Sequence, residues 1–314
     1  IVTYIFWDNL MTGLILILFA ALFFPGLIVR VKSIASGRKG PDLFQPLRDV
    51  RVLFRKGSVS GTSTGIILRI ATSVSLASVV SALRVLPFGN LPAPVSFEGD
   101  FIFFSYLLAL GRFFSIIGAL DTGSSFEGMG ANREAFFSML VEPAFFILMA
   151  AFAMFTGYTS FSEIFSGFYI YGNHFALIYS IIGFFILVQI AIVENSRVPV
   201  DDPKTHLELT MIHEVMILDY SGFDKALIHL ASWLKFAMFG SLIFNVIVPS
   251  GWNIALHIFL FLGIQALFAS IIGLVESFRA RNKMNKNPKF ILTLSAVGII
   301  AFLVILLMME KLSI

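Results

Sequence analysis

Residues 174–202, HFALIYSIIGFFILVQIAIVENSRVPVDD, contain both patterns that decide the fold of this chain. From His174 to Val193 the segment has no Asp, Glu, Lys or Arg, and about 20 such residues in a helix span the hydrocarbon core of a bilayer. Glu194 then begins a polar block that extends to Asp224 and holds seven of the chain's 19 acidic residues. A block this rich in titratable groups at a membrane is typical of a functional site.

Long apolar runs recur along the whole chain. The 314 residues are 58% hydrophobic and 13% charged, and the charged fraction is about half that of a soluble domain. We therefore expect an all-α polytopic membrane protein, with residues 1–314 forming a single membrane domain. The predicted spans are about 8–31, 64–87, 100–121, 137–157, 174–194, 226–249, 252–277 and 290–310.

Basic residues are distributed unevenly among the connections between these spans. One set of connections contains 17 of the 22 lysines and arginines, and the other set contains none. The positive-inside rule places the basic set in the cytoplasm and both termini outside a cell membrane. The basic connections are 30–63, 122–136, 195–225 and 278–289, and the others are 88–99, 158–173 and 250–251.

The first cytoplasmic connection, residues 32–63, contains a predicted amphipathic helix. In DLFQPLRDVRVLFRKG, residues 42–57, the apolar side chains Leu43, Leu47, Val50 and Phe54 recur at helical spacing and the charges fall on other faces. This pattern is typical of a helix that lies in the membrane interface. Two interpretations remain open: a surface anchor, or a gate or dock at the cytoplasmic mouth of a cavity.

The connection 195–225 is predicted to be partly helical. Asp202 suits a helix N-cap, Pro203 suits the first helical position, and Gly222 suits the end of the helix. Within that helix, His206 and His213 are seven residues apart and lie on nearly the same face. We expect this acidic segment to be a cytoplasmic functional loop.

The sequence lacks the motifs of a free-standing enzyme. The chain has no cysteine, so it cannot by itself form a thiolate zinc site or a cysteine-ligated iron–sulfur cluster. His213-Glu214 is followed by Val215, Met216 and Ile217, without the second histidine of a zinc-protease motif. Neither a Walker A sequence nor a dinucleotide-binding glycine fingerprint is present. We expect no metal, no cofactor and no complete active site in this chain, and no nucleic-acid partner.

Ionisable side chains in or near the spans form the candidate site. A charged group near the bilayer centre costs about 2.5–3.5 kcal/mol on insertion scales, so it is expected to pair or to face water. Carboxylates, a lysine and histidines together predict a proton relay. The candidate path residues are Glu134, Glu142, Glu194, Asp201, Asp202, Glu208, Glu214, His206, His213 and Asp121, with Arg112, Arg133, Arg197 and Lys235 as charge partners.

Some ionisable groups in or at the ends of the spans have a simpler interpretation. Glu194 and Glu276 end their spans, and their side chains can reach the interface without any further role. Arg112 and Asp121 lie nine residues apart on one span, and they can form structural pairs with other helices.

Three motifs, in order along the chain, resemble one known family. Glu194-Asn195-Ser196-Arg197-Val198-Pro199, followed by Asp201, resembles the E-x-x-R-x-P-x-D signature of the respiratory complex I membrane subunit called NADH dehydrogenase subunit 1. Residues 128–135, GMGANREA, with Glu142-Pro143 after them, also match this family. In the interfacial helix the matching residues are Phe44, Gln45, Pro46 and Asp49. The resemblance covers nearly the whole chain, with the same number and orientation of spans.

Residues 201–214, DDPKTHLELTMIHE, point to one branch of that family. They are similar to the homologous subunit of membrane-bound group 4 nickel–iron hydrogenases, formate hydrogenlyases and archaeal sulfane sulfur reductase, and they differ from the acidic run of the quinone-reducing branch. The resemblance implies a non-catalytic subunit that anchors a hydrogenase module to antiporter-like membrane subunits. Iron–sulfur clusters are then expected in the small subunit and a nickel–iron centre in the large subunit.

The resemblance also implies a function. The cytoplasmic acidic loop, residues 195–225, faces the small subunit, and the intramembrane carboxylates start a lateral path for H⁺ or Na⁺. Three alternatives remain open. A hydrophobic chamber under the interfacial helix favours the quinone-site subunit of an NADH-quinone oxidoreductase. Tolerance of neutralised Glu142 and Lys235 favours a passive anchor, and purification as a solitary active unit favours a stand-alone transporter.

Overall fold

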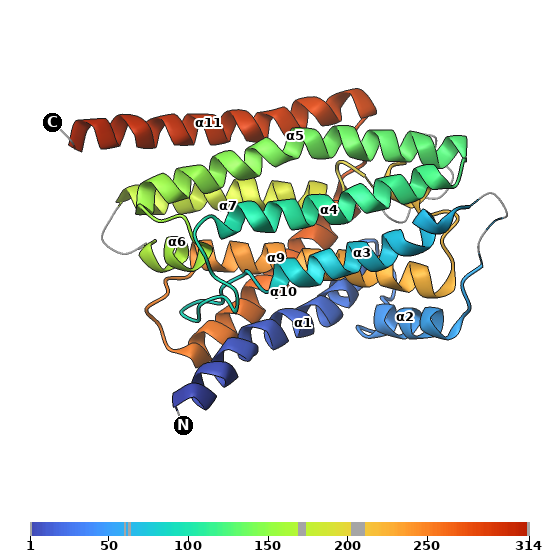
Figure 1. Cartoon of the computed structure of the whole chain (residues 1–314), viewed down its shortest axis with the longest axis horizontal. Helices are drawn as coiled ribbons and strands as arrows, with labels where there is room; N and C mark the ends of the chain where they lie inside the picture. Colours follow the sequence, from blue (N-terminus) through green and yellow to red (C-terminus); the bar gives the residue numbers. More distant parts are fainter. Residues whose placement is uncertain (1, 60, 62–63, 169–173, 202–210, 313–314) are drawn as a thin grey trace.

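The computed structural model describes residues 2–59, 61, 64–168, 174–201 and 211–312, which form a bundle of long helices (Figure 1). Among these described residues, eight helices are long and apolar enough to cross a membrane, and each corresponds to one predicted span, which confirms the all-α polytopic fold. They are α1 (Val2–Ala35), α3 (Ile66–Leu83), α4 (Asp100–Asp121), α5 (Ser125–Thr156), α7 (His174–Glu194), α9 (Gly222–Ile247), α10 (Ile254–Phe278) and α11 (Asn287–Leu312).

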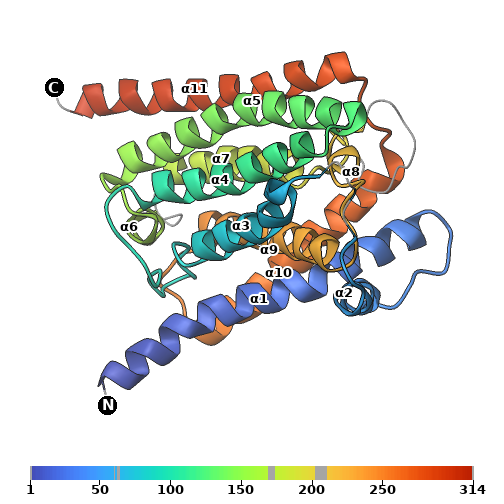
Figure 2. The same cartoon turned by 45° about the vertical axis from the view of Figure 1, so that its right-hand side comes forward.

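Helix α9 is the central column of the bundle. It packs against α1, α3, α7 and α10, and most of its membrane-spanning stretch is buried. Small residues such as Ala226, Ala237 and Gly240 allow the neighbouring helices to approach it closely. At the edges of the bundle α11 packs on α5 and α1 packs on α10 (Figures 1 and 2).

The two ends of the bundle carry different elements. The N-terminal end of α1, the C-terminal end of α11 and the short helix α6 (Phe161–Gly167) lie at the same end of the bundle (Figure 1). Helix α2 (Gln45–Arg55) and the four-residue helix α8 (His213–Met216) lie at the opposite end (Figure 2). The basic connections therefore share one end of the bundle, as the charge pattern predicts. That this end faces the cytoplasm stays a prediction.

Helix α2 confirms the predicted amphipathic helix. Pro46 lies in its first turn, where proline is well tolerated. Val50 is buried, Leu47 and Leu53 pack against the main core, and the arginines of the helix are exposed. Helix α2 packs on α1 and α9, so it covers one side of the bundle at this end.

Two predicted boundaries are wrong. Residues 122–136 are not a connection, because α5 already begins at Ser125. Gly128, Gly130 and Asn132 weaken the helical pattern there, but Gly130 is needed for packing, since an added Cβ would lie 2.9 Å from the Ile212 carbonyl oxygen. Gly222 does not end a helix but begins α9. The helix predicted within residues 195–225 was expected to start at Asp202 and Pro203, which lie outside the described residues.

Gly222 provides a test of how α2 is fixed to α9. Its φ is +49°, and an added Cβ would collide with the backbone carbonyl oxygens of Lys56 and Gly57, directly after α2. Gly222→Ala should therefore lower the thermal unfolding midpoint of the purified membrane complex. Gly123→Ala is the control, because Gly123 has φ +70° but no neighbour within 4 Å. The control should cost only the roughly 1–2 kcal/mol of a left-handed residue. Equal shifts in the two variants would contradict the packing argument.

Candidate functional site

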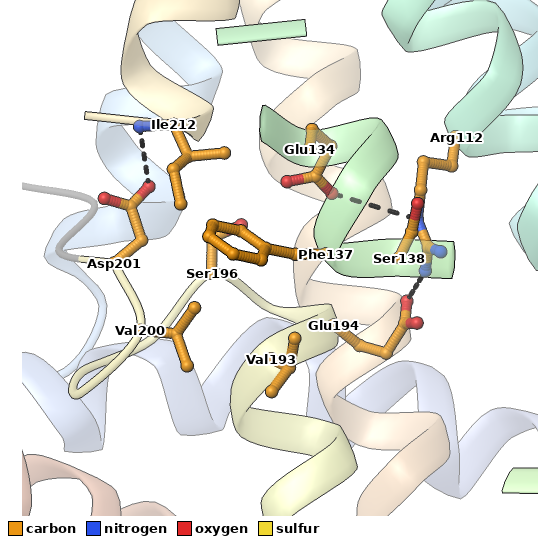
Figure 3. Close-up of a pocket in the computed structure, with 10 residues that line it drawn as sticks. All are labelled: Arg112, Glu134, Phe137, Ser138, Val193, Glu194, Ser196, Val200, Asp201 and Ile212. Carbon is orange, nitrogen blue, oxygen red and sulfur yellow. Dashed lines mark hydrogen bonds and ion pairs between the residues drawn. The ribbon is translucent and has the colours of Figure 1, made fainter. Parts of the chain in front are cut away.

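Arg112 of α4 is the centre of a group of acidic side chains (Figure 3). Its Nη2 forms an ion pair with Oε2 of Glu194. Its Nη1 lies 3.4 Å from Oε1 of Glu142, and its Nε lies 3.8 Å from Oε1 of Glu134. The Arg112 side chain is only 8% exposed. Three carboxylates from two other helices thus converge on one buried guanidinium.

Helix geometry explains why these carboxylates meet. Glu134 and Glu142 are eight residues apart on α5, a little over two turns, so both face α4. Glu194 is the last residue of α7. Lys235 of α9 adds a second cation, because its Nζ donates a hydrogen bond to the Glu194 carbonyl oxygen at 3.4 Å. We call these five residues the Arg112 cluster. All five are predicted site residues.

Small cavities surround the Arg112 cluster. Four of them have volumes of about 10, 20, 30 and 40 Å³, and a cavity of about 10–15 Å³ is enough for one water molecule. Glu134 lines three of them and Glu142 lines another. Ser75, Ser115 and Lys235 line both of the two larger cavities. The cluster therefore has room for water and side chains that can hydrogen-bond to it.

A larger chamber of about 250 Å³ lies beneath α2. Gln45, Pro46 and Asp49 of α2 line it, so these three predicted residues face the chamber. Phe44, the fourth, instead packs against Phe23 of α1, with ring centroids 5.8 Å apart. More than half of the lining residues are polar or charged, among them Asn195, Arg197, His213, Glu214, His229 and Ser232.

The chamber and the small cavities share wall residues. Asn195, His213 and Ser232 line both the chamber and the cavity of about 40 Å³, which also contacts Glu134 and Glu194. We call these three residues the neck. The small cavities in turn share Glu134 and Arg112 with one another. A series of adjoining cavities thus extends from the chamber to Glu142.

The remaining predicted residues fall into three groups. Asp201 and Arg133 hold the start of α8 and the residues before it: Asp201 Oδ2 accepts a hydrogen bond from the His213 N–H at 2.9 Å, and Arg133 donates one to the Met211 carbonyl at 3.0 Å. Asp121 accepts from the Leu68 N–H at 3.1 Å and so caps α3, about 13 Å along α4 from Arg112. Asp202, His206 and Glu208 lie outside the described residues.

Two acidic residues that the sequence did not assign to the site have clear partners. Glu276 pairs with Arg197 at 3.0 Å and with Lys32 at 3.3 Å. Buried Glu127 accepts a hydrogen bond from the Asp219 N–H at 3.0 Å. No sequence pattern connects residues this far apart in the chain. Glu127 also fell in the segment wrongly predicted to be a connection.

His213 is a neutral imidazole in this environment. Burial, followed by the positive charge of Lys235, lowers the pKa of His213 from 6.5 to about 3. A neutral imidazole both donates and accepts one hydrogen bond, which suits a residue of the neck. Among the described residues, no group of three His, Asp or Glu side chains is arranged to hold a metal ion.

Comparison with known proteins agrees with this architecture. The family described as NADH dehydrogenase matches residues 9–308. Hydrogenase-4 component C of Escherichia coli K12 is 30% identical over 73% of this chain and 71% of its own length. Formate hydrogenlyase subunit 4 of the same organism is 29% identical over 87% of this chain and 91% of its own length.

More distant relatives extend the comparison. One subunit of the NADH-quinone oxidoreductase of Neisseria meningitidis serogroup C is 25% identical over 67% of this chain and 59% of its own length. A chain of the archaeal membrane-bound sulfane sulfur reductase superposes with a TM-score of 0.75 over 94% of this chain and 99% of its own length, at 18% identity. This last similarity shows a shared fold.

The lowered pKa of His213 predicts a pH-dependent stability. A histidine in an unfolded chain titrates near pH 6.5, so protons bind the unfolded state first as the pH falls. The stability from neutral His213 is complete above pH 6.5 and is lost between pH 6.5 and about 3. His213→Gln should therefore become more stable relative to the native protein as the pH falls from 7.5 to 5. Thermal unfolding midpoints at both pH values check this, and a constant difference would contradict it.

Proposed function

This chain belongs to the NADH dehydrogenase family of complex I-related membrane subunits, and from that premise we propose that it couples a cytoplasmic redox module to ion movement across the membrane. The similarity to hydrogenase-4 component C and to formate hydrogenlyase subunit 4 supports a hydrogenase-type module. In this proposal the redox chemistry belongs to partner subunits with iron–sulfur clusters and a nickel–iron centre. This chain anchors them and provides the first part of the ion path.

The charge balance of the Arg112 cluster is the observation that carries this proposal. The cluster contains three carboxylates, Glu134, Glu142 and Glu194, and two cations, Arg112 and Lys235. A carboxylate without a counter-charge costs several kcal/mol in a medium of low dielectric. A proton bound to one carboxyl group restores the balance, and that proton can move among three neighbouring sites. The cluster is therefore suited to receive and pass on a proton.

The adjoining cavities supply the entry side of the path. In the proposal, water fills the chamber and reaches the neck at Asn195, His213 and Ser232. These three residues also line the water-sized cavity that contacts Glu134. Ser75 and Ser115 face the same space, and their hydroxyl groups lie 3.4 Å apart. Hydroxyl groups and water both donate and accept hydrogen bonds, so they can relay a proton. In the proposal, His206, Asp202, Glu208 and Glu214 deliver protons from the cytoplasm.

The exit side of the path lies at the outer face of α4 and α5. The Glu142 side chain is 39% exposed in the chain alone, and Tyr106 and Met139 beside it on this face are also exposed. A half-exposed carboxyl group in a membrane-spanning helix is unfavourable against lipid. This supports contact with a second membrane subunit, of the antiporter-like kind, that accepts the ion from Glu142.

Quinone reduction is a second candidate function, because the chamber lies where that interpretation expects one. Its volume of about 250 Å³ is close to the lower limit of ordinary ligand pockets. Its walls, however, carry two histidines, Arg197, Asp49 and Glu214. These groups favour water in their part of the chamber, whereas Pro25, Val29, Val50, Leu53 and Trp233 form an apolar part of its wall. Nickel-ligand cysteines in the neighbouring large subunit distinguish the hydrogenase interpretation from quinone reduction.

Glu142→Gln tests the proposed path in the intact complex reconstituted in vesicles. The amide keeps the size of the side chain but cannot carry an exchangeable acidic proton. The rate of ion translocation should fall about 100-fold or more, the lower end of what a proton-transfer group contributes, and the number of ions translocated per electron pair should fall with it. Assembly of the complex should be unchanged.

Glu98→Gln is the matched control, because Glu98 is exposed and lies at the opposite end of the bundle. Glu98→Gln should not change the number of ions translocated per electron pair. Undiminished pumping in Glu142→Gln, together with tolerance of Lys235→Met, would support a passive anchor instead.

A further inference from the structure

Residues 197–201 follow α7 after Asn195 and Ser196, and they are tied to the end of α10 and to the connector that leads to α11. This stretch is short, yet four of its residues contact that region. Two contacts are ion pairs and two are hydrogen bonds to backbone carbonyl groups. The pairs are Arg197 Nη1–Glu276 Oε1 at 3.0 Å, Asn282 N–Pro199 O at 2.8 Å, Asn287 Nδ2–Val200 O at 3.0 Å, and Arg281 Nη1–Asp201 Oδ1 at 3.4 Å.

Asp201 connects this stretch to the residues that precede α8. Its Oδ2 accepts hydrogen bonds from the backbone N–H groups of Ile212 at 3.3 Å and of His213 at 2.9 Å. Asp201 is 1% exposed. One buried carboxylate therefore holds residues 201 and 212–213 together, and it is itself held by Arg281. Residues 201 and 212–213 of the polar block are therefore attached to the α10–α11 connector through the same ion pair, Asp201–Arg281.

Glu276 of α10 holds the first residue of the same stretch, Arg197. Its carboxylate lies between Arg197 and Lys32 of α1, and its side chain is 2% exposed. A buried carboxylate between two cations is fully compensated, and removing one partner of such a pair is costly. Arg197 also lines the chamber, so Glu276 determines where the guanidinium meets the chamber wall.

We propose that the end of α10 and the α10–α11 connector form a clamp, with Glu276, Arg281 and Asn287 as positioning residues that hold Arg197–Asp201 and, through Asp201, His213 of the neck. This base clamp rests on the proposed function, because its purpose is to keep the neck aligned with the Arg112 cluster. Asp201, a candidate proton-path residue from the sequence, is assigned a positioning role, since the contacts at Arg281, Ile212 and His213 are all with hydrogen-bond donors. These three donors fix the position of the carboxylate, so that it can hold residues 212 and 213 in place.

Hydrogen exchange in the intact complex tests the clamp without depending on ion pumping. Arg281 contacts neither Ile212 nor His213 in these hydrogen bonds, but it holds Asp201, which does. Arg281→Gln should therefore speed amide exchange at Ile212 and His213 by about tenfold or more. Arg281→Lys, which keeps the charge, should restore most of the protection. Arg279→Gln, an exposed arginine of the same connector, is the control and should have no effect.

A second variant keeps the test valid if Arg281→Gln does not assemble. Asn287→Ala removes only the hydrogen bond to the Val200 carbonyl, and it should increase exchange at Ile212 and His213 more weakly. Unchanged exchange at these two amides in both variants would overturn the clamp.

The positioning role is tested by ion translocation in the same variants. Arg281→Gln and Asp201→Asn should lower the ratio of ions to electrons by a similar factor, and the double variant should be no worse than either single one. Additive losses, or a shifted pH profile in Asp201→Asn alone, would instead place Asp201 on the proton path. Faster exchange with an unchanged ratio would overturn the positioning role and leave the clamp structural. The proposed function fails separately, through Glu142→Gln, whatever the exchange experiment shows.

Discussion

A charged side chain in a membrane-spanning helix needs an opposite charge or water, and the interior of this chain is arranged around that constraint. Arg112 lies on a transmembrane helix with an 8% exposed side chain, and carboxylates from α5 and α7 surround it. The contacts of Arg112 bring α4, α5 and α7 together at one level of the bundle. The same contacts leave the site with more acidic than basic groups. In the proposed function, the constraint that assembles the helices therefore also provides a site for an exchangeable proton.

The Arg112 cluster and the base clamp are separate networks that meet at the chamber. Arg197 belongs to the clamp and lines the chamber, and His213 belongs to the neck and donates its backbone N–H to Asp201. A displacement of residues 197–201 therefore changes the chamber wall and the neck together. Coupling between distant sites requires an element that both sites can bias. Residues 197–201 are in the right position, because ion pairs fix them to α10 and the α10–α11 connector and Asp201 accepts a hydrogen bond from His213 of the neck.

Hydrophobic periodicity was sufficient to predict the eight spans and α2, because burial in lipid or against neighbouring helices imposes the pattern directly. It failed at residues 122–136, since glycines that permit close packing weaken the helical signal in the same way as glycines of a loop. It also misassigned Gly222, whose positive φ and close approach to Gly57 serve the start of α9.

The candidate site was predictable in composition but not in pairing. Charged residues in apolar spans identify Arg112, Glu142, Glu194 and Lys235 without any structure, whereas Glu134 lay in a predicted connection and was identified through the matching motif at residues 128–135. The partners of Glu276, by contrast, lie 79 and 244 residues away in the chain, and no local pattern contains that information. The positioning role of Asp201 likewise depends on contacts with Arg281 and with the residues before α8.

The central claim is that the Arg112 cluster holds one exchangeable proton. Infrared difference spectroscopy of the intact complex, comparing the resting and reduced states, measures this directly through the C=O stretching band of a protonated carboxyl group. The account predicts a band that changes between the two states in the native complex and that is lost or shifted when Glu134, Glu142 or Glu194 is replaced by Gln. A difference spectrum without such a band, or one whose band is the same in all three variants, would contradict it.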